Sequence, residues 1–204
     1  MDLEHLEQLE ERPPPRERTK SRLRMAWDWV RKRPLPIVAL RVYDQLTRRL
    51  TGIPVWRYSQ ITPQLYVGGQ HWPPALDGME QRGIHSIVNL RREFDDAEAG
   101  IARDHYLHLP TEDNTALSQH DLKAGAQFIA ERINEGDSVY VHCAVGVGRA
   151  PTMAAAYLVS AGETPEQAWE IIRRQRPFIW PNRRQRAALR QFADNLKNAD
   201  RPTP

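Results

Sequence analysis

The spacing of apolar residues changes twice along this 204-residue chain. Residues 1–20 are charged, contain three consecutive prolines and have few apolar groups, which predicts a flexible tail. From 21 to 57, apolar residues recur at intervals of three and four, as in amphipathic helices. From 58 to 198, short β-branched and aromatic runs alternate with longer helical patterns. The pattern therefore predicts a tail, a basic helical extension, one folded domain and a second short tail at 199–204.

Within residues 58–198, the alternating runs predict a layered fold. Strands are predicted at 65–67, 84–90, 106–109 and 138–142, and helices at 118–135, 151–162, 164–176 and 183–197. Ser118 is expected to cap the first of these helices, with the carboxylate of Asp121 in its first turn. Strands separated by helices favour an α/β fold with a central, mostly parallel sheet flanked by helices.

Charge is distributed unevenly along the chain. Residues 16–57 hold 12 Lys and Arg against three acidic residues, whereas residues 58–204 hold 16 against 18. In residues 21–50 the basic side chains lie opposite Trp and Leu, the pattern of a helix on an anionic membrane surface. The alternative, which we favour, is that these helices pack on the folded domain and their charges are solvated.

Several classes of protein fit the sequence poorly. The acidic start does not resemble a secretion signal, and the longest uncharged apolar run, 150–162, is shorter than the ~18 residues of a membrane span. The single cysteine, Cys143, forms no intrachain disulfide and suits a reducing compartment, so we expect a cytoplasmic protein that could be peripheral at a membrane. His105 and His108 point to opposite faces of a predicted strand, and no nucleic-acid module is visible. We therefore expect no metal, cofactor or nucleic acid, and the oligomeric state stays open.

The candidate chemistry lies at the end of the predicted strand 138–142. Cys143 follows this strand, a five-residue loop comes next, and Arg149 stands where a helix begins; the loop is Ala144, Val145, Gly146, Val147 and Gly148. The N–H groups of such a loop can turn inward around a phosphate dianion, and the helix N-terminus adds its positive end. The same field favours a thiolate at Cys143, and the planar fork of Arg149 matches two phosphate oxygens.

The sequence His142-Cys143, five residues and Arg149 resembles the active-site loop of the protein tyrosine phosphatase superfamily. The Arg-Ala-Pro-Thr continuation and the small size resemble the dual-specificity branch, and the resemblance covers about residues 58–196. It implies that Cys143 is the nucleophile, that Arg149 clamps the phosphate and that no metal takes part. His142 is expected to fix the orientation of the nucleophile through the neighbouring backbone. The segment 178–183 resembles the closing turn of the family, for which we favour a packing role.

The general acid is expected in the polar loop at 109–115, after a predicted strand. In the resembled family an Asp about thirty residues before the Cys protonates the leaving group, and Asp113 lies thirty residues before Cys143. Glu112 is the alternative.

The substrate stays open among three readings. A phosphoprotein, as for a tyrosine or dual-specificity phosphatase, is the main one. Residues 109–115 and 138–158 also resemble phosphatidylglycerophosphate phosphatase, and Arg-Ala-Pro resembles plant glucan phosphatases, so a phospholipid (including a phosphoinositide) or a phosphoglucan is an alternative. A phosphate-binding module without turnover is the third. The loop has Ala144 and Val145 after the Cys, and not the Lys that is typical of lipid-directed members. Ala150 replaces the Ser or Thr that most members of the resembled family have after the Arg, which predicts slower hydrolysis of the phosphoenzyme.

Overall fold

The computed structural model describes residues 31 and 33–199. Two compact units divide the chain, residues 1–38 and residues 39–204. The predicted tail at 1–20, residues 21–30 of the predicted extension and residues 200–204 lie outside the described part.

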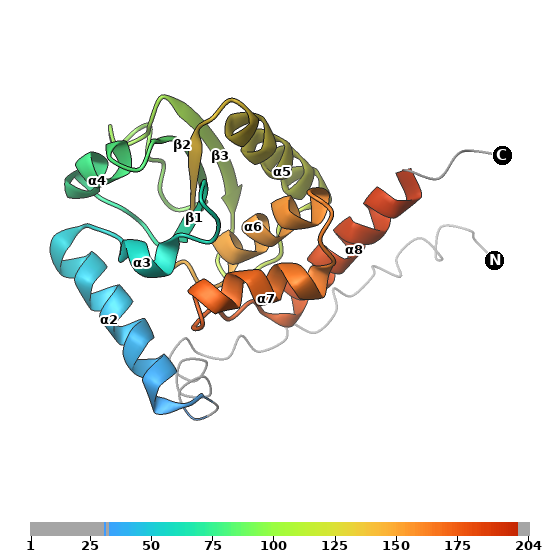
Figure 1. Cartoon of the computed structure of the whole chain (residues 1–204), viewed down its shortest axis with the longest axis horizontal. Coiled ribbons are helices and arrows are strands. Elements are labelled where there is room, and N and C mark those ends of the chain that lie inside the picture. Colours follow the sequence, from blue (N-terminus) through green and yellow to red (C-terminus); the bar gives the residue numbers. More distant parts are fainter. Residues whose placement is uncertain (1–30, 32, 200–204) are drawn as a thin grey trace, which may run out of the picture. The chain divides into compact units, whose positions relative to one another are not determined.

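A four-stranded parallel sheet forms the centre of the second unit (Figure 1). Its strand order is β1 (Leu65–Gly68), β4 (Ser138–His142), β2 (Ile84–Arg91) and β3 (His105–Thr111). Every residue of β1 and β4 is buried, as expected of parallel strands covered on both faces. The predicted α/β class is therefore confirmed. Because all four strands run the same way, their carboxyl ends meet at one edge of the sheet.

Eight helices accompany the sheet in the described part of the chain. They are α2 (Leu35–Thr51), α3 (Trp56–Ser59), the 3-10 helix η2 (Pro73–Ala75), α4 (Leu76–Glu80), α5 (Gln119–Asn134), α6 (Arg149–Ser160), α7 (Pro165–Gln175) and α8 (Arg183–Ala199). Two hydrophobic clusters cover the two faces of the sheet. In β4, Val139 and Val141 point into the larger cluster, with α5, α6 and α8, while Tyr140 points into the smaller one, with η2 and α4. This alternation follows from the two-residue period of a strand.

Local capping signals define the helix starts on the larger face. The Ser118 side chain accepts a hydrogen bond from the N–H of Asp121 at 3.0 Å, which is the cap that the sequence predicted. Thr164 and Gln167 form a reciprocal capping box at the start of α7. Such contacts satisfy N–H groups that have no partner within the helix.

Helix α2 ties residues before the predicted domain to the second unit. Asp44 and Arg48 are buried, although a charged helical extension was expected to expose such residues. Asp44 pairs with Arg176, which lies 132 residues further along the chain. The second compact unit begins at Ala39. The expected boundary between the extension and the domain, between residues 57 and 58, stays a prediction. None of the described helices is long and apolar enough to cross a membrane.

Candidate active site

Cys143 follows β4 at the carboxyl edge of the sheet, and only 3% of it is exposed. The N–H of Gly146 donates a hydrogen bond to its Sγ over 3.2 Å. Gly146 has a φ of +73°, and a Cβ there would lie 2.3 Å from the backbone carbon of Gly68. Only glycine fits this position. Gly148, the other glycine of the loop, has a φ of −125° and needs no left-handed conformation.

Neighbouring segments hold the carbonyl groups of the loop. The hydrogen bonds join Ala144 O to Gln70 N (3.3 Å), Gly146 O to Arg176 Nε (2.8 Å) and Val147 O to Trp180 N (2.6 Å). A trans peptide places its C=O and the following N–H on opposite sides. Carbonyls anchored outside the loop therefore turn the N–H groups of residues 145, 147 and 148 the other way, as a phosphate cradle requires.

Arg149 is the first residue of α6, and 1% of it is exposed. Its Nη1 donates to the carbonyls of Leu90 (3.1 Å) and Thr111 (2.6 Å), near the ends of β2 and β3. Its Nη2 donates to carboxylates of Glu93 (3.3 Å) and Asp113 (3.2 Å). Its buried Nε has no hydrogen-bond partner among the residues that the structure describes. The guanidinium thus has a fixed position and one N–H left for an acceptor.

Glu93 belongs to this site, although the sequence analysis did not single it out. Both of its carboxylate oxygens contact Arg149, at 3.3 Å each, and Oε1 also accepts a hydrogen bond from Arg91. Burial alone would raise the pKa of Glu93, but the hydrogen bonds from the two guanidinium groups lower it to about 2. Burial alone would lower the pKa of Arg149, whereas the negative charges of Cys143, Glu93 and Asp113 raise it above its ordinary value. The only sequence signal for Glu93 is its position just beyond a predicted strand.

Of the two candidate acids, Asp113 is the one that contacts Arg149. Its side chain is 42% exposed and also accepts a hydrogen bond from Asn114 Nδ2 at 3.3 Å. The loop is held from α8 and the segment before it: Asn182 Nδ2 donates to Asn114 O (2.8 Å) and Gln185 Nε2 to Thr115 O (3.0 Å). The closing segment, for which a packing role was favoured, therefore positions the acid loop.

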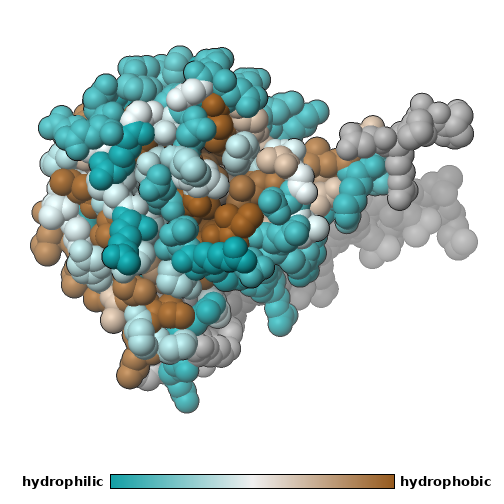
Figure 2. Space-filling model, in the orientation of Figure 1, coloured by the Kyte–Doolittle hydropathy of each residue, from teal (hydrophilic) through white to brown (hydrophobic). Residues whose placement is uncertain are grey.

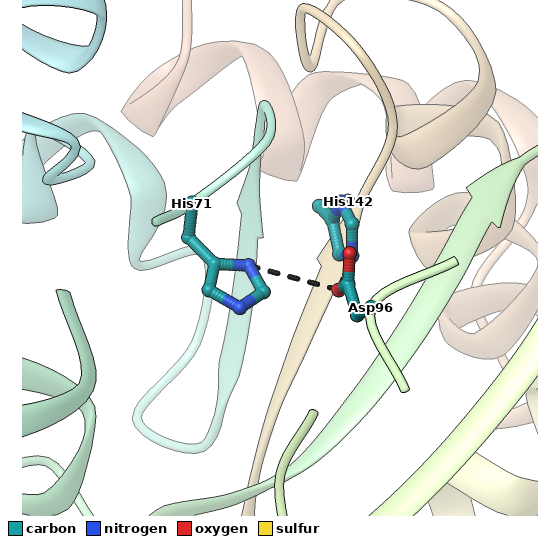
Figure 3. A group of neighbouring side chains, drawn as sticks. All are labelled: His71, Asp96 and His142. Carbon is teal, nitrogen blue, oxygen red and sulfur yellow. Dashed lines mark hydrogen bonds and ion pairs between the residues drawn. The ribbon is translucent and has the colours of Figure 1, made fainter. Parts of the chain in front are cut away.

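His142 is fixed by a buried carboxylate that the sequence analysis missed. Its Nε2 lies 2.7 Å from Asp96 Oδ2, and the other oxygen of Asp96 accepts a hydrogen bond from Gln70 at 2.9 Å. His71 Nδ1 lies 3.9 Å from the same carboxylate (Figure 3). Burial lowers the pKa of His71 to about 4, so that imidazole is neutral at pH 7. Burial would raise the pKa of Asp96, but hydrogen bonding to His142 lowers it below its ordinary value.

His71, Asp96 and His142 also form the one group of potential metal ligands found among the described residues, with donor atoms within 4.8 Å of one another. A metal on His142 Nε2 would move the ring proton to Nδ1. This atom is buried and has no hydrogen-bond partner among the described residues. A buried donor without an acceptor is costly. The group therefore fits a hydrogen-bonded support for the cysteine loop and does not fit a metal centre.

The sequence and the fold both match known phosphatases. The family model described as "Dual specificity phosphatase, catalytic domain" matches residues 65–195. The rat dual specificity protein phosphatase 5 is 31% identical over 175 residues, which cover 84% of this chain and 42% of that protein. The mouse dual specificity protein phosphatase 2 is 29% identical over 143 residues, covering 69% and 41%. The chain thus spans less than half the length of these relatives.

Solved structures agree in fold. A crystal structure of PTPMT1 in complex with PI(5)P has a TM-score of 0.64 and 23% identity, covering 69% of this chain and 97% of that one. Human DUSP28 has a TM-score of 0.62 and 20% identity, covering 69% and 98%. Since the family model matches well over half of the residues, and includes the loop from Cys143 to Arg149, this chain belongs to the dual-specificity phosphatase family of cysteine-dependent phosphatases.

Proposed function

We propose that this chain hydrolyses phosphomonoesters of proteins through a cysteinyl-phosphate intermediate. The observation that carries the proposal is the position of Arg149, which lies at the end of the cysteine loop and contacts Asp113. A nucleophile, an anion clamp and a proton donor are thereby brought to one edge of the sheet. Phosphoryl transfer needs this combination of positioning and charge stabilisation.

In the first step the Cys143 thiolate attacks phosphorus in line with the ester oxygen. The S–P bond forms as the P–O bond breaks, and Asp113 gives its proton to the departing oxygen. The Nε of Arg149, which has no partner among residues 31 and 33–199, is available to donate to a phosphate oxygen together with the N–H groups of the loop. Glu93 keeps the guanidinium in that position, and Asp96 keeps His142, and so the backbone at Cys143, in place.

In the second step water attacks the phosphorus of the intermediate. Asp113, now a carboxylate, accepts a proton from this water while the S–P bond breaks, which releases inorganic phosphate and regenerates the thiolate. The donors of Arg149 and of the loop stabilise the charge on the phosphoryl oxygens in both steps.

Two exposed tryptophans, each next in structure or sequence to a residue of the site, favour phosphotyrosine as the protein substrate. Trp180 is 38% exposed, and its backbone N–H donates to Val147 O in the loop. Trp72 is 40% exposed and packs edge-on against Phe94, which follows Glu93 in the sequence. Exposed aromatic groups can pack against the ring of a phosphotyrosine. Ala144 and Val145 add no charge to the loop, so a highly anionic substrate is not preferred.

The test is phosphate release by the full-length protein and by Cys143→Ser. A phosphotyrosine peptide, a phosphothreonine peptide, phosphatidylglycerophosphate micelles and a phosphoglucan are compared in parallel. Turnover of phosphotyrosine by the wild type alone is the expected result. If the wild type hydrolysed only the lipid or only the glucan, the proposed substrate class would be wrong and the proposed mechanism would stand. If neither protein releases phosphate, even from a small aryl phosphate, the chain is a phosphate-binding module.

An anionic membrane surface is a second candidate partner, favoured by the outward face of α2. Five of the seven exposed large hydrophobic residues in the described chain lie on this helix: Leu35, Val42, Tyr43, Leu46 and Leu50. Hydrophobic surface lies at the lower left of Figure 2, where Figure 1 draws α2. Among the basic residues at 31–51, Arg31 and Arg49 are exposed, whereas Arg48 is buried. Apolar groups beside positive charge suit the interface of an anionic bilayer.

Co-sedimentation with vesicles tests this partner. The full-length protein should bind vesicles of phosphatidylglycerol and phosphatidylcholine more tightly than vesicles of phosphatidylcholine alone, and Leu46→Gln with Leu50→Gln should weaken that binding. Equal binding by the double variant and the wild type would exclude this face as the contact. A change of oligomeric state in the double variant would instead assign the face to a second copy of the chain.

A further inference from the structure

We propose that Asp44 of helix α2 is a positioning residue for the catalytic loop, on which it acts through Arg176. The proposal rests on the phosphatase function proposed above. Asp44 precedes residues 65–195, which match the family model, so that match gives it no part in the site. The contact that first links it to the chemistry is the hydrogen bond from Arg176 Nε to Gly146 O, at 2.8 Å.

Arg176 is fully buried, and all three of its side-chain nitrogens are engaged. Nε donates to Gly146, Nη1 to Tyr58 O at 3.0 Å, and Nη1 and Nη2 to the two oxygens of Asp44 at 3.3 and 3.1 Å. The Phe178 ring lies 4.5 Å from its Cζ. Because a guanidinium is planar and rigid, a carboxylate on one edge fixes the direction in which the opposite edge donates. Asp44 therefore fixes the direction in which Arg176 Nε donates its hydrogen bond.

Gly146 passes this constraint to the nucleophile. Its carbonyl is held by Arg176, while its own N–H donates to Cys143 Sγ at 3.2 Å. A shift of the Arg176 guanidinium therefore moves Gly146, whose N–H is hydrogen-bonded to the sulfur of Cys143. The left-handed conformation of Gly146, with a φ of +73°, leaves few other ways to place that N–H.

A second contact from the same face of α2 supports the loop. Arg48, one helical turn after Asp44, donates from Nη1 to Gln70 O at 3.1 Å. The N–H of Gln70 in turn donates to Ala144 O at 3.3 Å. Helix α2 thus reaches two carbonyls of the cysteine loop through buried charged side chains. A helix that only covered the core would need apolar residues on this face.

The experiment compares Asp44→Asn with wild type in the full-length protein, well below the melting temperature. The substitution removes the charge at nearly constant volume. We expect kcat/KM for an aryl phosphate to fall about tenfold, and competitive inhibition by inorganic phosphate to weaken about tenfold, each equivalent to about 1.4 kcal/mol. Inhibition by phosphate reports the shape of the loop in the folded enzyme, which a loss of stability alone does not change.

Three further variants separate positioning from stability. Asp137→Asn removes a carboxylate that accepts a hydrogen bond from His85 N at 3.0 Å, but at the edge of the sheet opposite Cys143. It should lower Tm and leave phosphate inhibition unchanged. Asp44→Glu keeps the charge and should recover part of the activity. Arg176→Lys keeps a positive charge but lacks the planar fork of the guanidinium, so its kcat/KM and phosphate inhibition should change as in Asp44→Asn. If Asp44→Asn does not fold, Arg176→Lys is measured in its place.

The proposal is wrong if Asp44→Asn or Arg176→Lys lowers Tm while kcat/KM and phosphate inhibition stay at wild-type values. If the wild type hydrolyses no phosphomonoester, the proposed function fails instead. Calorimetric binding of inorganic phosphate to wild type and Asp44→Asn then decides the role of Asp44 by itself: weaker binding by the variant supports it and equal binding overturns it.

Discussion

At the scale of single residues, Ala150 is where this chain departs from the usual family pattern. It follows Arg149 in α6 and is fully buried. Ala150→Ser would add a hydroxyl donor in the first turn of the helix. We expect hydrolysis of the cysteinyl phosphate to speed up about tenfold, the equivalent of one hydrogen bond of about 1.4 kcal/mol. Stopped-flow kinetics with an aryl phosphate should then show a smaller burst; an unchanged burst and an unchanged pH profile would contradict the role of Ala150.

The ion pair of Glu93 with Arg149 predicts how the stability of the protein depends on pH. The pKa of Glu93 in the folded protein, about 2, is below the ordinary value of 4.5. Its ion pair with Arg149 therefore stabilises the protein fully at pH values above 4.5, and this stabilisation is lost as the pH falls toward 2. Glu93→Gln should therefore lower Tm at pH 7, and the difference from wild type should shrink between about pH 4.5 and 2. Calorimetric Tm values across that range test this. A difference that persists at pH 2 would show that packing, and not the charge of Glu93, is responsible.

At the scale of elements, the turn from β4 into α6 depends on Gly146. Gly146→Ala would require both a strained φ and a Cβ 2.3 Å from the Gly68 backbone, so we expect activity to fall about a hundredfold or more. Gly136→Ala is the matched control, because Gly136 also has a positive φ, +91°, but has open space around it and precedes β4. It should cost about 1 kcal/mol of stability and no activity. If both variants lost activity equally, the contact of the added Cβ with the Gly68 backbone would be excluded as the cause of the loss.

The elements themselves were largely predictable, whereas their connections to the site were not. Periods of two and of three to four residues predicted the four strands and the helices from α5 to α8, because burial of one face imposes them locally. Glu93, Asp96 and Arg176 carry no such signal. Each acts through a partner 46 to 132 residues away: Arg149 for Glu93, His142 for Asp96 and Asp44 for Arg176. The cysteine loop was visible in sequence because its nucleophile, glycines and arginine are contiguous.

At the scale of the whole molecule, the same long-range pairing leads us to expect that the independently stable unit starts before residue 44. Asp44 is 2% exposed and supplies the carboxylate of a fully buried Arg176, so it cannot be removed without leaving a charge in the interior. Loss of one partner of a buried ion pair typically costs about 3–5 kcal/mol. The boundary between residues 57 and 58 that the sequence predicted would cut this pair.

Two shortened chains test this boundary. A chain that starts at residue 31 retains α2 and should unfold at the same urea concentration as the full-length protein. A chain that starts at residue 58 lacks Asp44 and Arg48, and its midpoint should fall by about 2 M, given an unfolding slope of about 2 kcal/mol per M. Asp44→Asn in the longer chain should reproduce much of that loss, since the charge of one carboxylate causes it. If the chain from residue 58 were as stable as the longer one, the folded unit would begin after α2 and the ion pair would be dispensable.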